Sequence, residues 1–398
     1  MTVDDKQRLD RLLGAWLLVV LRPLAQLAGK LMRRDHASAP RGEIVFVKLM
    51  GGGSLLIALP ALLGVRRRFP DRTLTLVCGS PVAPFAELIG IFDRIERVED
   101  RGGVLALIAS AARILAALVR RRVDTIVDLE VYSQLTTVFS LLTLARNRIG
   151  FYVESTYWRR NVQTHLVFFN RARGVFHFYA AAVRLLGAHP ATRAEVRAHL
   201  LERVGGAPSH EVGEYLAVGA GCSDFASVRL LPPAEWRAYA QVRRAELAGK
   251  RWVFLGAAAD RATSEEVASA LSGVFGGEFA FDNLCGELTL AESLARIAGA
   301  RRFLGIDSAL IHAARALGVP SASFFGPTDP ATLLEPVEGY TEEVHYRPPI
   351  CSPCLHVAQV PPCKGQNVCM RLFTSDRVPL TPWCEDASGE SVLAPEVE

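Results

Sequence analysis

A run of glycines after a short apolar segment could form a turn that binds phosphate. Residues 44–47 are Ile-Val-Phe-Val, residues 51–53 are all glycine, and Ser54 opens an apolar stretch. A strand that turns through glycines into a helix presents unpaired backbone N–H groups, which suit an anion. Ser54 cannot act as a general base at neutral pH without a base of its own.

A second turn of this kind lies in the other half of the chain. Residues 303–320 read as a strand, a turn at Asp307 and Ser308, and a helix that carries His312. Residues 324–330 read as a further strand and a sharp turn that contains Thr328. Ligands of open parallel sheets bind at such carboxyl ends, so the two turns suit a pyrophosphate. The alternative is that Asp307 and Ser308 are simple helix caps and that His312 is a core residue.

Four cysteines near the C-terminus have the spacing C-x2-C-x8-C-x5-C. They are Cys351, Cys354, Cys363 and Cys369. Four thiolates so close in sequence suffice for a tetrahedral structural zinc site, and the first pair has the spacing of metal ligands. Free thiols or a disulfide are the alternatives.

The N-terminal segment, residues 8–34, is predicted to form an amphipathic helix. Its longest uncharged apolar run, residues 12–21, is too short to span a bilayer. Pro23 is expected to kink or split the helix. The helix either lies on an anionic membrane surface or docks on the protein's own core or a partner subunit. The basic stripe consists of Arg8, Arg11, Arg22, Gln26, Lys30 and Arg33.

Strand-like and helix-like segments alternate through most of the remaining chain. This rhythm predicts an α/β protein with two Rossmann-like halves, each with a parallel sheet covered by helices. We expect the helix and a linker in residues 1–40, a first domain in 41–212 and a second in 213–345. A Cys-rich segment follows in residues 346–384, and a disordered tail is expected in residues 385–398.

The composition of the 398 residues limits the function classes. Lys and Arg number 45 and Asp and Glu 41, and the basic residues are scattered, so the charge gives no argument for nucleic acid. The chain has no convincing secretory signal peptide, so we expect it in the cytoplasm, where its eight cysteines are thiols or metal ligands.

The ordered motifs resemble glycosyltransferase family 9, the heptosyltransferases of lipopolysaccharide core assembly. The resemblance implies the GT-B fold, with two sheets facing a central cleft, and inverting sugar transfer from a nucleotide donor, commonly ADP-heptose, without a metal ion in the chemistry. The motifs that carry it are residues 59–62, 66–70, 128–129, 148–150, 286–292, 307–312 and 325–330.

The resemblance also assigns donor-binding residues. Arg229 stands where the family usually has a lysine, and a guanidinium can hold a diphosphate with two hydrogen bonds, so the role is kept. With the glycines of the first turn, the expected donor-binding set is Gly52, Gly53, Gly221, Ser223, Arg229, Asp307, Ser308, His312 and Thr328.

Ser54 departs from the family, which usually has an aspartate there as the proposed general base. Glu130, which with Asp128 ends the predicted strand 125–129, is the favoured replacement on the same rim, because inverting transfer generally wants a carboxylate. Glu154 is a second candidate. Alternatively, the acceptor is already an anion and needs no base, or the protein has lost activity.

These features together predict an inverting glycosyltransferase on the inner face of the cytoplasmic membrane, with a lipid-linked or lipopolysaccharide-type acceptor. A sugar-nucleotide epimerase on the same scaffold and a catalytically inactive nucleotide-binding or scaffold subunit are the alternatives.

Overall fold

The computed structural model divides the chain into two compact units, Met1–Val196 and Arg197–Glu398. It describes residues 3–32, 35–100, 102–206, 213–222, 227–355, 357–358 and 361–374. The division falls within α7 (Arg193–Arg203), earlier in the chain than the second domain that we expected from residue 213. Ser223, Arg33 and the expected tail, residues 385–398, lie outside the described residues.

The first unit is built on a six-stranded parallel sheet with the order β3-β2-β1-β4-β5-β6. All five residues of β1 are buried, and β1 pairs with β2 on one side and β4 on the other. Because all strands are parallel, their carboxyl ends share one edge. The strands are β1 (Ile44–Lys48), β2 (Leu74–Gly79), β3 (Arg94–Val98), β4 (Thr125–Asp128), β5 (Asn147–Tyr152) and β6 (His165–Phe168).

Helices cover both faces of this sheet. The chain runs outward from β1 to β3 through α2 and α3, then returns through α4 and α5, so right-handed connections place these pairs on opposite faces. The helices are α2 (Gly52–Arg68), α3 (Ala83–Ile89), α4 (Gly103–Arg121), α5 (Gln134–Leu142), the 3-10 helix η1 (Glu154–Arg159) and α6 (Val175–Leu185).

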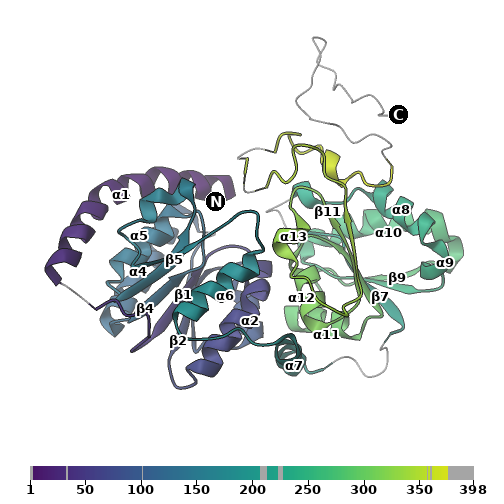
Figure 1. The fold of residues 1–398 in the computed structure, drawn as a ribbon. Helices are drawn as coiled ribbons and strands as arrows, with labels where there is room; N and C mark the ends of the chain where they lie inside the picture. Colours follow the sequence, from purple (N-terminus) through teal and green to yellow (C-terminus); the bar gives the residue numbers. More distant parts are fainter. Residues whose placement is uncertain are drawn as a thin grey trace, which may run out of the picture. The chain divides into compact units, whose positions relative to one another are not determined.

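The N-terminal helix α1 (Val3–Met32) packs along α5 (Figure 1). Leu18 is buried with Val138 and Val162, and a Cβ at Gly14 would lie only 2.5 Å from Cβ of Gln134. Asp10 accepts hydrogen bonds from the backbone N of Gln134 and Leu135 and so caps α5. One side of α1 is therefore docked on the protein's own core, which was one of the two alternatives for this helix.

The opposite side of α1 remains apolar and exposed. We call it the α1 apolar face: Leu12, Trp16, Val19, Val20, Leu24, Leu27 and Leu31, each 56–76% exposed. Of the predicted basic stripe, Arg8, Arg11 and Lys30 are exposed, whereas Arg22 and Gln26 are half-buried. By length and composition alone Asp5–Leu31 could cross a membrane, although the uncharged run was expected to be too short.

The expected break at Pro23 does not split α1, which continues from Val3 to Met32. Pro23 is exposed. The carbonyl group that loses its helical partner at a proline can then bond to water, which lowers the cost of keeping the helix continuous.

The second unit repeats the architecture around a sheet of order β12-β11-β10-β7-β8-β9, again parallel throughout. Trp236, Trp252 and Phe324 are fully buried in its core. The predicted α/β class with two Rossmann-like units is confirmed. Its strands are β7 (Tyr215–Gly219), β8 (Arg251–Phe254), β9 (Ala280–Asn283), β10 (Arg302–Ile306), β11 (Ser321–Phe325) and β12 (Glu342–Tyr346).

The helices of the second unit follow the same alternation. They are η2 (Ser227–Arg229), α8 (Pro233–Val242), α9 (Arg244–Leu247), η3 (Ala258–Asp260), α10 (Arg261–Phe275), η4 (Gly276–Glu278), α11 (Leu290–Gly299), α12 (Ala309–Leu317), α13 (Pro330–Leu333) and η5 (Val368–Met370).

Candidate functional site

Four of the predicted donor-binding residues meet at the carboxyl edge of the second sheet. Asp307 directly follows β10, and its Oδ2 accepts a 2.6 Å hydrogen bond from Oγ1 of Thr328, which follows β11. Nε of Arg229 lies 3.3 Å from the same oxygen, and Nε2 of His312 lies 3.8 Å from Oδ1. The structure thus brings Arg229, Asp307, His312 and Thr328 together.

The N-terminus of α12 opens beside this cluster. Ser308 is the N-cap residue, but its side chain makes no capping bond, and its buried hydroxyl has no hydrogen-bond partner among the described residues. Backbone N–H groups in the first turn of a helix have no partner within the helix and carry partial positive charge. This place therefore suits an anion such as a diphosphate, rather than the simple cap considered above.

Gly221 lies at the same edge, in the segment that directly follows β7. A Cβ at Gly221 would lie 2.1 Å from Oδ1 of Asp260. Glycine is therefore required here by the close approach of the Asp260 carboxylate.

His312 is neutral at physiological pH. Burial lowers its pKa to about 4, against the opposing effect of Asp307. The unfolded chain therefore binds this proton more tightly than the native state between pH 6.5 and about 4, and stability is lost as the pH falls through that window. At neutral pH, His312 can act as a hydrogen-bonding group but not as a cation.

A pH titration tests this assignment. Between pH 6.5 and pH 5, His312 should cost the second unit about 1.5 kcal/mol, and His312→Gln should lack that loss. Urea unfolding of wild type and variant at the two pH values measures it, with His189→Gln as the control. Equal pH slopes for wild type and His312→Gln would contradict a buried neutral His312.

The predicted glycine turn lies at the carboxyl edge of the first sheet. Gly51 has φ of 80°, the left-handed region that favours glycine, and α2 begins at Gly52. A Cβ at Gly52 would lie 2.2 Å from the ring of Phe85, so a side chain does not fit there either. Gly53 is the second residue of α2.

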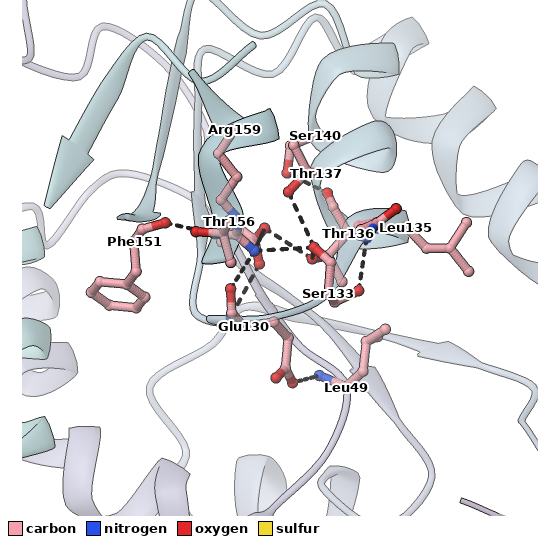
Figure 2. Close-up of polar contacts among 12 residues, drawn as sticks. Leu49, Glu130, Ser133, Leu135, Thr136, Thr137, Ser140, Phe151, Thr156 and Arg159 are labelled. Atoms are coloured by element: carbon pink, nitrogen blue, oxygen red, sulfur yellow. Dashed lines mark hydrogen bonds and ion pairs between the residues drawn. The ribbon is translucent and has the colours of Figure 1, made fainter. Parts of the chain in front are cut away.

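Glu130 holds this turn from the neighbouring strand (Figure 2). Its Oε1 accepts hydrogen bonds from the backbone N of Leu49 at 2.8 Å and of Met50 at 3.1 Å, and Nζ of Lys48 lies 3.1 Å away. Burial alone would lower the pKa of Lys48, but Glu130 and Tyr179 outweigh it and the pKa is raised. Lys48 is therefore a buried cation beside Glu130, which the sequence analysis missed.

Asp128 is completely buried, so it can influence the candidate site only through the residues that it contacts. It lies 3.1 Å from the guanidinium of Arg159 and accepts hydrogen bonds from Thr136 and from the backbone N of Glu130. Arg159 also donates to the backbone O of Glu130 and of Ser133 (Figure 2). Asp128 thus fixes the segment that carries Glu130 and does not reach an acceptor.

Ser54 is linked to a second residue that the sequence analysis missed. Its side chain hydrogen-bonds with Tyr179 of α6, which is buried and whose pKa is raised by burial. Tyr179 also interacts electrostatically with Lys48. Ser54, Lys48 and Glu130 therefore belong to one polar group at this edge. Glu154 lies apart in η1, where it accepts a hydrogen bond from Tyr152.

The four cysteines interact with one another electrostatically, and zinc binding by them stays a prediction. Within the described residues, no group of three or more His, Cys, Asp or Glu side chains is arranged to hold a metal. Burial raises the pKa of Cys369 to about 12, and the neighbouring thiols of Cys354, Cys363 and Cys351 raise it as well. Cys369 packs in the core with Met370, against Gly326. Sequence spacing suggested thiolate ligands, but at least Cys369 serves as an apolar core residue.

A protein-family model matches part of the second unit. Residues 210–361 match the model of glycosyltransferase family 9 (heptosyltransferase). This range contains Arg229, Asp307, His312 and Thr328. A comparison with curated protein sequences gave no match.

Solved structures of two heptosyltransferases and of a family 9 glycosyl transferase share the fold of both units. Family 9 glycosyl transferase from Veillonella parvula is 18% identical, with 81% of this chain and 89% of that chain covered and a TM-score of 0.58. Escherichia coli heptosyltransferase WaaC with ADP is 19% identical, with coverages of 76% and 92% and a TM-score of 0.57. Escherichia coli ADP-heptose lps heptosyltransferase II is 16% identical, with the same coverages and a TM-score of 0.54.

These comparisons confirm the predicted GT-B fold and support the predicted glycosyltransferase class. Residues 210–361 of the second unit are therefore similar to glycosyltransferase family 9, and the chain has the two-unit fold of the solved heptosyltransferases.

Proposed function

We propose that the protein transfers a sugar, with inversion, from a nucleotide diphosphate donor to a lipid-linked or lipopolysaccharide-type acceptor. The observation that carries the proposal is the group of Arg229, Asp307, His312 and Thr328 beside the N-terminus of α12, within the family 9 domain. Arg229 and the helix N-terminus would hold the diphosphate by charge and by hydrogen bonds.

ADP-heptose is the donor that we propose. Escherichia coli WaaC has been solved with ADP and with ADP-2-deoxy-2-fluoro heptose, and it shares this fold. The residues that we assign to the reaction are side chains and helix N–H groups that bind and orient the donor, and we propose that no metal ion takes part in the chemistry.

The acceptor would bind at the carboxyl edge of the first sheet, near Ser54 and Glu130. Of the carboxylates considered, Glu130 is the one that shares a polar group with Ser54 and Lys48. We therefore propose Glu130 as the group that takes the proton of the acceptor hydroxyl. An acceptor that is already an anion would need no base, and Lys48 would then supply a charge to bind it.

We also propose a peripheral location on the inner face of the cytoplasmic membrane. The α1 apolar face leaves seven large apolar side chains exposed, and the basic residues Arg8, Arg11 and Lys30 accompany it. An exposed helix face of this composition suits the interface of an anionic bilayer.

Thermal shift with nucleotides tests the donor. ADP at about a hundred times its dissociation constant should stabilise the protein by roughly 2.7 kcal/mol, more than UDP, GDP or CMP at the same concentration. Arg229→Ala should weaken ADP binding by about tenfold or more, because it removes a charged hydrogen-bonding partner. Arg237→Ala, on the exposed side of α8, is the matched control and should leave binding unchanged.

Product analysis separates the rival functions. Incubation of the protein with ADP-heptose alone should leave the donor unisomerised, whereas an isomer would identify an epimerase. Transfer to a lipopolysaccharide-type acceptor, with inversion at the anomeric carbon, supports the proposal. Nucleotide binding without turnover on a panel of acceptors would identify an inactive binding or scaffold subunit.

A further inference from the structure

The first two turns of α4 expose large apolar side chains on the surface of the first unit. Leu105 is 84% exposed, Ile108 46% and Val104 40%. In the nineteen residues of α4 only Ser110, Ile114 and Leu118 are buried. A helix that covers a sheet usually turns polar residues to water, so this apolar outward side is unexplained by the fold.

The charge of α4 has a single sign. The segment Gly103–Arg121 contains no Asp or Glu, and Arg113 and Arg120 are exposed. By length and composition alone α4 could cross a membrane, but it connects β3 to β4, two strands of one sheet, and so cannot cross a bilayer. An exposed apolar tip followed by arginines suits an anionic lipid surface.

An ion pair joins the start of α4 to the start of α1. Nζ of Lys6 in α1 lies 2.7 Å from Oδ2 of Asp100, which precedes α4. The side chains of this pair are 22% and 8% exposed, so the contact is largely withdrawn from water. The exposed tip of α4 therefore lies beside the N-terminal end of the helix that carries the α1 apolar face.

Asp100, which forms this ion pair, also lies near the candidate acceptor site. A Cβ at Gly79, the last residue of β2, would lie 2.3 Å from the backbone O of Leu49 and 3.4 Å from Oδ2 of Asp100. Leu49 is in turn held by Glu130. Asp100 and the start of α4 are thus neighbours of the turn that contains Ser54, at one edge of the sheet.

We propose that the α4 tip (Val104, Leu105 and Ile108) and the α1 apolar face form one surface that binds an anionic lipid bilayer. This surface brings the carboxyl edge of the first sheet, with Ser54 and Glu130, to the membrane. The inference rests on the proposed membrane location and adds to it a second contact that sets the orientation of the site. A lipid-linked acceptor then reaches Glu130 without leaving the bilayer.

A bilayer fits this surface better than a second copy of the chain. In a symmetric pair the same surface meets itself, so Arg8 and Arg11 of one copy would approach those of the other. Anionic headgroups instead match these side chains and the arginines of α4.

Binding to vesicles tests the inference. The double variant Leu105→Gln/Ile108→Gln should bind vesicles of phosphatidylcholine and phosphatidylglycerol about tenfold or more weakly than the wild type, because two apolar side chains no longer enter the lipid. Val242→Gln, at a 72% exposed position of the second unit, is the matched control and should bind as the wild type does. The double variant Leu12→Gln/Trp16→Gln measures separately how much the α1 apolar face contributes to vesicle binding.

The outcomes distinguish the inference from the function on which it rests. Wild-type binding that is lost in the α1 variant but kept in the α4 variant would overturn the two-helix surface and leave the membrane location intact. A wild type that binds no vesicles would overturn both, while the nucleotide thermal shift tests donor binding independently. If light scattering without lipid shows a dimer that the α4 variant dissociates, and vesicle binding is unchanged, the surface is an interface between copies. Hydrogen exchange in the first unit that matches the wild type in both variants shows that they fold, since both substitutions lie in that unit.

Discussion

Asp128→Asn is expected to lower the free energy of unfolding of the first unit by about 3–5 kcal/mol, because it leaves the buried charge of Arg159 without a charged partner. Both side chains are 0% exposed. Burial raises the pKa of Asp128 to about 6 and lowers the pKa of Arg159. Both shifts show that burial disfavours the charges, so the pair is costly to form and still more costly to break.

A second substitution separates the charge of Arg159 from its hydrogen bonds to the backbone. Arg159→Met in the Asp128→Asn background should recover only part of the loss, since Arg159 also donates to the carbonyls of Glu130 and Ser133.

Hydrogen exchange in residues 125–160 during urea unfolding measures the effect on the first unit. The control is Glu87→Gln, which breaks an ion pair with Arg97 whose side chains are 50% and 57% exposed. That change should cost less than about 1 kcal/mol, because water already solvates both groups. A similar small loss in Asp128→Asn would show that the Asp128–Arg159 pair is not isolated from solvent.

Local patterns in the sequence were sufficient to predict the turns that carry the candidate sites. Gly51 takes the left-handed conformation that the glycine run suggested, and α2 follows at Gly52. Asp307 directly follows β10 and precedes α12, as the strand-turn-helix pattern indicated. Such turns depend on a few consecutive residues, so the types and the order of these residues are enough to predict them.

The contacts between distant segments could not be predicted in the same way. Lys48 and Glu130 are 82 positions apart, and they meet because β1 and β4 are neighbours in the sheet. The available signal was a charged residue, Lys48, at the end of a fully buried strand. Its partner depends on strand order, which composition and periodicity do not determine.

The N-terminal helix shows why apolar patterns alone do not identify a binding surface. Leucines occur on both the docked and the exposed sides of α1, so the sequence left the two interpretations open. Gly14 was the informative residue, because a small side chain permits the close approach of Gln134. For the cysteines, spacing predicted that they lie close together, and the structure adds that Cys369 also packs among apolar side chains.

Glu130→Gln is expected to lower turnover by about a hundredfold or more while donor binding is nearly unchanged, because general-base catalysis contributes about that much. The substitution suits the test, since a glutamine oxygen can still accept from the backbone N of Leu49 and Met50, as Oε1 of Glu130 does. The variant therefore removes the basic carboxylate and keeps most of the support for the glycine turn. Glu154→Gln, at the second candidate carboxylate, is the matched control.

The pH profile of turnover decides whether Glu130 takes the proton or positions Lys48 and the turn. A general base gives kcat/KM an acidic limb, and Glu130→Gln would abolish that limb along with the activity. If Glu130 has only a positioning role, Glu130→Gln would lower kcat and leave the acidic limb of the pH profile in place. Lys48→Met would then cause a similar loss of kcat, since Nζ of Lys48 lies 3.1 Å from Oε1 of Glu130. Unchanged turnover in Glu130→Gln, with a large loss of turnover in Glu154→Gln, would show that Glu154 in η1 is the general base. If neither carboxylate matters, an acceptor that is already ionised would explain why Ser54 stands where the resemblance to family 9 leads us to expect an aspartate.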